Sequence, residues 1–160
     1  MTKILIALGI LLAILTVLVI LGRKSVHHEI LIEATPETVW NVLTDTDNYD
    51  SWNPVMKLLE GEIKEGNQVL YQFTQDPDNI IEMPSTVKQI VPQKLLNQGG
   101  GPPLILTFDH RYILESQGSG TKLTIHEDYA GIGVNFWNPA PVEAAYGRLN
   151  EAIKARAESR

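Results

Sequence analysis

The stretch TFDHRYILESQGSGTKLTIHEDYA, residues 107–130, does most to decide the fold of this chain. Two runs rich in β-forming residues flank the turn QGSG at 117–120, which predicts an antiparallel hairpin. With QGSG as a four-residue loop, the register of the hairpin places Glu115 opposite Lys122, a favourable pair of opposite charges across two strands. Because side chains alternate along a strand, one face of the hairpin carries a mostly apolar set that we expect to look inward: His110, Tyr112, Leu114, Leu123, Ile125 and Glu127.

The same register has a cost on the outer face, where Asp109 would lie opposite Asp128. Like charges directly opposite each other are unfavourable in a sheet. We therefore predict that the ladder frays or twists at this pair. His126 shares the outer face and is expected to meet solvent.

The segments around the hairpin complete an α+β pattern. Strands are predicted at 25–34, 57–64, 67–75, 80–91, 104–115 and 121–130 from their alternation and β-forming residues, the last two being the arms of the hairpin. The stretch QGGGPP at 98–103 is predicted to be a loop that cannot form regular structure.

Two helices and a turn are also predicted. The first helix covers 35–45 and begins at the N-cap Thr35 with Pro36 in the first helical position. A short helical turn follows at 48–54. The long helix at 141–160 buries a stripe made of Val142, Ala145, Tyr146, Leu149 and Ile153.

Several antiparallel strands with one long C-terminal helix predict an α+β layer fold, in which a curved antiparallel sheet wraps around that helix. The helix is the only large element available to cover the inner face of the sheet. A strongly curved sheet around a single helix tends to leave space between them. We therefore expect an apolar cavity, as an inference from the architecture rather than from one residue.

An apolar segment precedes this domain. Ile4–Gly22 contains fourteen Ile, Leu or Val residues and no charge, and a helix of this length matches the roughly 30 Å hydrocarbon core of a bilayer. A cleaved signal peptide is the alternative, but the run ends in VLVILGRKS without a small-x-small cleavage site. We expect residues 1–24 to be an uncleaved single-pass membrane anchor and residues 25–160 to be the ligand-binding domain. Lys3 and the amino terminus balance Arg23 and Lys24, so the charges leave the membrane side open.

The composition excludes several classes of function. Ten of the thirteen Lys and Arg residues and all nineteen Asp and Glu residues lie after residue 24, which gives a net charge of roughly −9 and argues against nucleic acid. The chain has no Cys, and His27 and His28 are adjacent, so they point to opposite faces of a strand. We therefore expect no metal site and no cofactor, and GGGPP does not form a phosphate-binding loop.

Three stretches carry a family resemblance: IEATPETVWNVLTDTDNYDSWNP (32–54), DHRYILESQGSGTKLTIHEDYAG (109–131) and RLNEAIKARAE (148–158). Together they resemble the SRPBCC superfamily, also called START-like, Bet v 1-like or polyketide cyclase/dehydratase-like, over residues 26–158. The resemblance implies the helix-grip fold but not one function, because this fold hosts many unrelated activities. Thr35 replaces the usual Ala, and LLNQGGG (95–101) departs from the usual Trp and Gly after the Leu.

The candidate site contains two polar residues that project into a mostly apolar interior, His110 and Glu127. They could anchor a polar group of a ligand, act as an acid–base pair on a carbonyl substrate, or form a buried pair that only fixes the hairpin. Further inward candidates are Val69, Tyr71, Phe73, Trp52 and Asn53, the last two resembling the cavity-edge motif of the family, with Phe136 and Trp137 as candidates for a gate. Plain core packing is the alternative for each aromatic residue, and a turn or capping role for Asn53.

Three hypotheses for the function follow from these patterns. The favoured one is non-catalytic binding of a hydrophobic small molecule or lipid by the tethered domain. The second is a cyclase/dehydratase-like enzyme that uses His110 and Glu127. The third is a protein-interaction module, which would show an exposed apolar patch and little enclosed volume.

Overall fold

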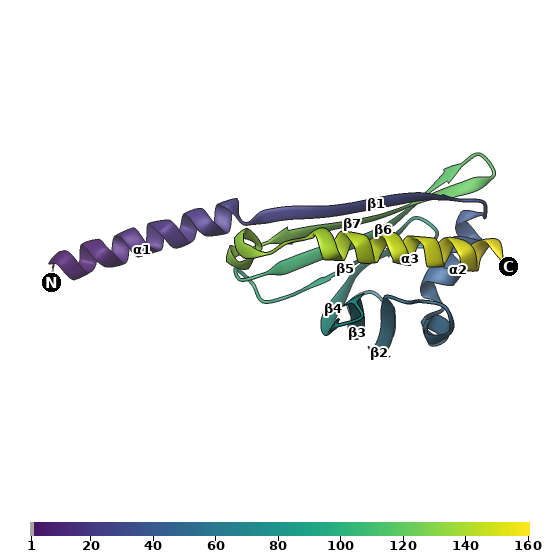
Figure 1. Ribbon diagram of the computed structural model, residues 1–160, viewed down its shortest axis with the longest axis horizontal. Coiled ribbons are helices and arrows are strands. Elements are labelled where there is room, and N and C mark those ends of the chain that lie inside the picture. The colour runs from purple at the N-terminus through teal and green to yellow at the C-terminus, as the bar shows by residue number, and fades with distance from the viewer. Residues whose placement is uncertain (1) are drawn as a thin grey trace.

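The computed structural model describes residues 2–160. The elements of this part of the chain are α1 (Thr2–Leu21), β1 (Arg23–Ile32), α2 (Pro36–Thr44), the 3-10 helix η1 (Thr46–Ser51), β2 (Met56–Glu60), β3 (Gln68–Asp76), β4 (Asn79–Val91), β5 (Leu95–Gly100), β6 (Thr107–Gln117), β7 (Gly120–Ala130), η2 (Ile132–Phe136) and α3 (Ala140–Glu158). The strands of residues 2–160 form one antiparallel sheet in the order β1-β7-β6-β5-β4-β3-β2. Figure 1 shows this sheet curving around α3, with α1 projecting from one end.

The long helix α3 packs along the inner face of the sheet. Its buried residues recur every three or four positions, as expected for a helix with one apolar face: Val142, Ala145, Tyr146, Leu149, Asn150, Ile153 and Ala157. The predicted α+β helix-grip fold is therefore confirmed.

The hairpin of β6 and β7 has the predicted register. Glu115 pairs with Lys122, and their charged groups lie 2.7 Å apart. His110 lies opposite Glu127. All six side chains predicted to share the inner face of the hairpin are buried.

The expectation that the ladder frays at Asp109 and Asp128 is wrong. The pairing runs without interruption from Thr107 opposite Ala130 to the turn. Arg111, which shares the outer face, lies 2.6 Å from Asp109 and 3.2 Å from Asp128, and Lys88 lies 2.6 Å from Asp109. These cations neutralise the like charges, so the ladder stays intact.

The prediction that 98–103 cannot form regular structure is also wrong for its first half. Gln98, Gly99 and Gly100 belong to β5, a strand that was not predicted. A Cβ at Gly100 would collide with the carbonyl oxygen of Pro84 and press on the ring of Phe108. The glycines therefore mark a crowded strand, and the loop begins at Gly101, whose φ of +89° favours glycine.

The first helix of the domain begins as predicted. The Thr35 hydroxyl accepts a hydrogen bond from the Thr38 amide at 3.3 Å, and Pro36 occupies the first helical position. α2 buries Val39, Val42 and Leu43 and packs against α3.

The N-terminal helix α1 is long and apolar enough to cross a membrane, by length and composition, and a signal sequence would pass the same test. Gly22 is the single residue between α1 and β1. The Gly131 amide donates to the Gly22 carbonyl at 2.8 Å, and the Asn135 side chain donates to the Leu18 carbonyl at 2.8 Å. The end of α1 is thus bonded to the loop after β7.

Candidate functional site

An apolar cavity of about 320 Å³ lies between the first turns of α3 and the sheet. This volume equals that of roughly ten water molecules in the liquid, at about 30 Å³ each, and falls at the small end of the range for ligand sites. Its walls are mostly aromatic and aliphatic: Phe73, Ile81, Met83, Pro84, Leu106, Phe108, Tyr129, Trp137, Val142 and Tyr146, with Gln75, Glu82, Gly101 and Pro102.

The cavity is open on one side. The exposed members of its lining are Ile81, Glu82 and Pro84 from β4, and Gly101 and Pro102 from the loop between β5 and β6. The mouth therefore lies between the first half of β4 and the β5–β6 loop. An apolar molecule could enter here without unfolding any strand.

A buried carboxyl group, that of Glu127, is hydrogen-bonded to two residues of the cavity wall. Glu127 is 1% exposed, and its Oε2 atom accepts hydrogen bonds from the hydroxyls of Tyr129 at 2.7 Å and of Tyr146. Burial, followed by the nearby charge of Glu127, raises the pKa of both tyrosines well above the usual value of 10. Both hydroxyls therefore stay protonated and keep donating. Both tyrosines line the cavity, whereas Glu127 does not.

His110, which is also buried, lies next to this carboxyl group. Its Nδ1 atom is 3.5 Å from Glu127 Oε2, and in the described chain neither ring nitrogen has a hydrogen-bond partner. Its ring makes edge contacts with Tyr112 and Tyr146, at centroid distances of 4.5 and 5.2 Å. Buried polar atoms usually find partners, so His110 retains unused hydrogen-bonding capacity.

The row of buried polar residues formed by Glu127 and His110 extends onto the next strand, β5. Gln98 of β5 lies opposite His110 and is buried, and its Oε1 atom has no partner within residues 2–160. Burial raises the pKa of Tyr71 to about 12, and a hydrogen bond with Gln98 opposes this shift. Gln98, His110 and Glu127 thus cross three neighbouring strands at one level, behind the cavity.

Most of the predicted site residues lie in packed core rather than at the cavity. Phe73 lines it, and its ring lies 5.8 Å from that of Tyr146. The other inward-facing candidates are buried members of the core: Val69, Tyr71, Tyr112, Leu114, Leu123 and Ile125.

The remaining candidates have separate positions. Trp52 packs on Tyr49 with ring centroids 5.2 Å apart. The Asn53 side chain accepts from the amides of Val55 and Met56 at 3.0 and 2.8 Å, which is a turn-capping arrangement. Phe136 is 80% exposed and is not among the residues that line the cavity, whereas its neighbour Trp137 lines the wall.

Several cavity residues were not predicted from the sequence. Phe108 precedes His110 by two positions and Tyr129 follows Glu127 by two, so strand alternation could have assigned both to the inner face. Leu106 lies outside the strand and offered no such signal.

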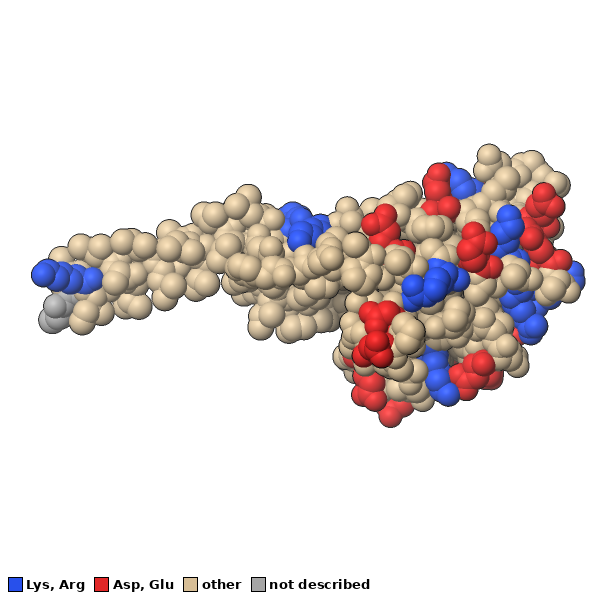
Figure 2. Space-filling model, viewed as in Figure 1, with Lys and Arg blue, Asp and Glu red and all other residues tan. Residues whose placement is uncertain are grey.

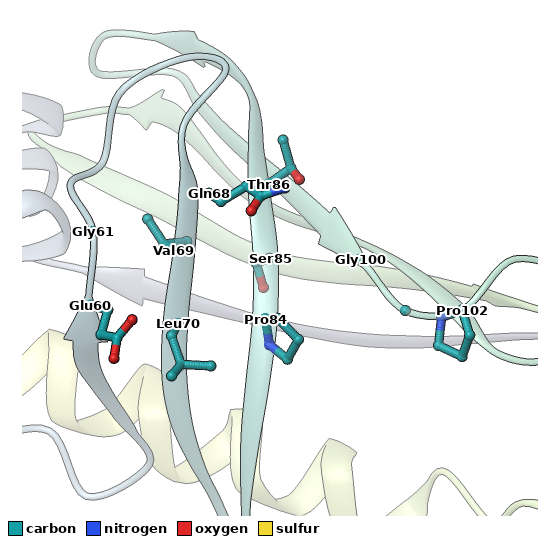
Figure 3. Close-up of a pocket in the computed structure, with 11 residues that line it drawn as sticks. Glu60, Gly61, Gln68, Val69, Leu70, Pro84, Ser85, Thr86, Gly100 and Pro102 are labelled. Atoms are coloured by element: carbon teal, nitrogen blue, oxygen red, sulfur yellow. The ribbon is translucent and has the colours of Figure 1, made fainter.

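A second, larger hollow of about 780 Å³ involves β3, β4 and the end of β5 (Figure 3). Gln68, Leu70 and Thr86 alternate with buried neighbours, so they project from the face of the sheet away from α3. Its lining combines exposed side chains, such as Glu60 and Gln68, with the buried Val69 and Ser85. A ligand there would stay in contact with water. The smaller cavity is the better candidate because its lining is almost entirely apolar.

A curved sheet that grips one long helix and encloses an apolar hollow defines the helix-grip class of proteins. A family model described as "Polyketide cyclase / dehydrase and lipid transport" matches residues 23–158. The chain belongs to this family, which confirms the SRPBCC-like resemblance.

Solved structures share the fold at low sequence identity. A protein from Chromobacterium violaceum is 16% identical with a TM-score of 0.69, covering 84% of this chain and 96% of its own. The Zhui aromatase/cyclase from Streptomyces sp. R1128 is 19% identical with a TM-score of 0.69, covering 86% and 95%. Ara h 8.0201 is 12% identical with a TM-score of 0.67, covering 86% and 99%. A search of curated proteins finds no match.

Proposed function

We propose that this protein binds a hydrophobic small molecule or lipid in the cavity beneath the first turns of α3, without catalysing a reaction. The single observation that carries this proposal is the apolar hollow of about 320 Å³ lined by Phe73, Met83, Trp137 and Tyr146. The family description, which includes lipid transport, supports the same class of ligand.

The proposal includes a membrane tether. Residues 1–24 form a single-pass anchor whose helix α1 spans the bilayer, and residues 25–160 form the binding domain. The mean hydropathy of 3.3 in α1 and its length of 20 residues support this role. The tether keeps the cavity close to ligands dissolved in the membrane and so raises their effective concentration.

A non-catalytic role agrees with the position of the polar residues. The cavity lining includes neither His110 nor Glu127. The two hydrogen-bond donors to the Glu127 carboxyl group, Tyr129 and Tyr146, line the hollow, whereas the carboxyl group itself does not.

Native mass spectrometry of the full chain, purified from cells, tests the proposal. We expect a co-bound apolar species in the wild type and its loss in Val142→Phe, because the new ring fills the hollow. Ala144→Phe is the matched control, since it adds the same ring to an exposed position on the same turn of α3. A wild-type protein that is reproducibly empty and takes up no apolar probe would contradict the proposal.

One observation favours a second candidate, a cyclase/dehydratase-like enzyme. The two unpartnered ring nitrogens of His110 are available to bind or move a proton, and Glu127 is 3.5 Å away. This candidate requires that Glu127→Gln abolishes turnover of a bound carbonyl compound while the fold is retained. Unchanged turnover in that variant would eliminate the pair as catalytic residues.

A further inference from the structure

The domain carries a group of exposed apolar side chains at the end where α1 joins it. Leu104, Ile105 and Phe136 are 67%, 60% and 80% exposed, more than any other large apolar residue among positions 22–160. Two backbone hydrogen bonds hold their segments together, from the Ile132 amide to the Leu104 carbonyl and from the Gly133 amide to the Ile105 carbonyl. We call these three residues the apolar rim.

The apolar rim is level with the last turn of α1. Asn135, next to Phe136, donates a hydrogen bond to the Leu18 carbonyl, and Leu18 precedes the end of α1 by three residues, or about 4.5 Å along the helix axis. A Cβ at Gly22 would collide with the Gly131 carbonyl oxygen. With one residue between α1 and β1, the domain has little freedom to turn the rim away from the helix end.

The charge pattern marks the same end. Neither 95–108 nor 129–142 contains Asp, Glu, Lys, Arg or His, although the domain as a whole is acidic. Figure 2 shows that Asp and Glu gather over the part of the domain far from α1. The charges nearest the end of α1 in sequence are the cations Arg23 and Lys24, and Lys24 donates a hydrogen bond to the Trp137 carbonyl. This combination suits contact with a lipid surface.

The rim lies on two segments that also line the cavity, and one of them, the β5–β6 loop, borders the mouth. Pro102 and Leu106 line the cavity on either side of Leu104 and Ile105, and Trp137 lines it next to Phe136. An apolar ligand that leaves the bilayer at the rim would meet the cavity wall within a few residues.

We propose that the apolar rim inserts into the interface of the bilayer that holds α1, so that the cavity exchanges its ligand directly with the lipid phase. This inference deepens the proposed function and rests on α1 spanning the membrane. It assigns the partner of the exposed patch as lipid rather than protein.

Single cysteines provide the test, because the natural chain contains none. The full chain is reconstituted into phosphatidylcholine vesicles with an environment-sensitive fluorophore on Phe136→Cys or Ile105→Cys. Both side chains are exposed, so neither change disturbs the core. Ala13→Cys reports on α1, and Ser119→Cys in the turn between β6 and β7 is the control for a distant surface.

We expect blue-shifted emission at positions 136 and 105, with loss of intensity when the lipid carries shallow nitroxide quenchers. Position 13 should respond to deep quenchers, and position 119 should show water-like emission and no quenching. Quenching at position 13 with water-like emission at positions 136 and 105 would overturn the rim proposal and leave the anchor standing. A blue shift at the rim without lipid quenching would indicate a second copy of the chain instead and would also overturn it. Absence of quenching at position 13 would refute both the anchor and the rim.

Discussion

The two halves of α3 cover the same sheet but produce different interiors. Along the C-terminal half, Leu149, Ile153 and Ala157 are fully buried, and α2 packs against the helix. Along the N-terminal half, Val142 and Tyr146 border the cavity. Figure 1 shows α2 near the C-terminal end of α3, whereas loops and the end of α1 lie near its N-terminal end.

This difference suggests why a hollow exists in a well-packed fold. Close packing of an interior requires side chains from every side. In the half where α2 supplies Val39, Val42 and Leu43, the space is filled. Where loops replace a second helix, the aromatic side chains line the space without filling it, and the buried Glu127 and its tyrosine donors form the boundary between the halves.

The largest effect should come from removing side chains in the packed half. Ile153→Ala should lower the free energy of unfolding by about 2–5 kcal/mol, the usual cost of a buried Ile-to-Ala change that leaves a cavity. Val142→Ala should cost less, because the atoms removed already border a hollow. Urea unfolding of the full chain in one detergent compares the two, and equal losses would show that the halves are packed alike.

An intermediate effect is expected at the boundary between the halves. Tyr146→Phe removes one of the two donors to the buried Glu127 oxygen and should cost about 0.5–1.5 kcal/mol, the usual net contribution of one hydrogen bond. Tyr129→Phe is the control, because it removes a donor from the same oxygen nearer the edge of the core, and its loss should be smaller. Unfolding measurements that find Tyr146→Phe as stable as the wild type would contradict this account of the boundary.

The smallest effect concerns the outer face of the sheet, where Asp109 contacts side chains from β4, β5 and β6. Burial works to raise its pKa, but hydrogen bonds from Lys88 and Asn97 and the charges of Lys88 and Arg111 outweigh it, so the pKa of Asp109 is lowered. Its contribution to the stability of the fold is therefore present above the ordinary Asp pKa of about 3.9. This contribution is lost as the pH falls through the lower pKa that Asp109 has in the folded protein.

Asp109→Asn tests this dependence. At neutral pH the variant should be less stable than the wild type by no more than about 1 kcal/mol, the typical limit for a partly exposed ion pair. The difference should vanish in acid. A difference in stability that persists unchanged at low pH would mean that shape or hydrogen bonding, rather than charge, explains the effect.

The sequence was sufficient for the fold and for much of the inner face. Alternation and the charge pair Glu115–Lys122 set the hairpin register correctly, including His110 opposite Glu127. β5 was missed because three successive glycines are typical of loops, whereas here the first two, Gly99 and Gly100, permit close approach of neighbouring strands.

The position of the hollow was harder to predict. Strand alternation assigns a residue to a face, but it does not say which end of that face a helix leaves uncovered. Tyr71 and Tyr112 therefore looked as suitable as Phe73 and yet lie in packed core. That Tyr146 donates to Glu127 depends on how α3 is rotated against the sheet, which is a tertiary property.

Photolabelling of the full chain in phosphatidylcholine vesicles with a diazirine-bearing fatty acid tests the occupied cavity most directly. Peptide mapping should find label on the segments that contain Met83, Trp137 and Tyr146, and this label should disappear in Val142→Phe while persisting in Ala144→Phe. Label that is confined to α1 and the apolar rim, and that is the same in both variants, would contradict the existence of a ligand site under α3.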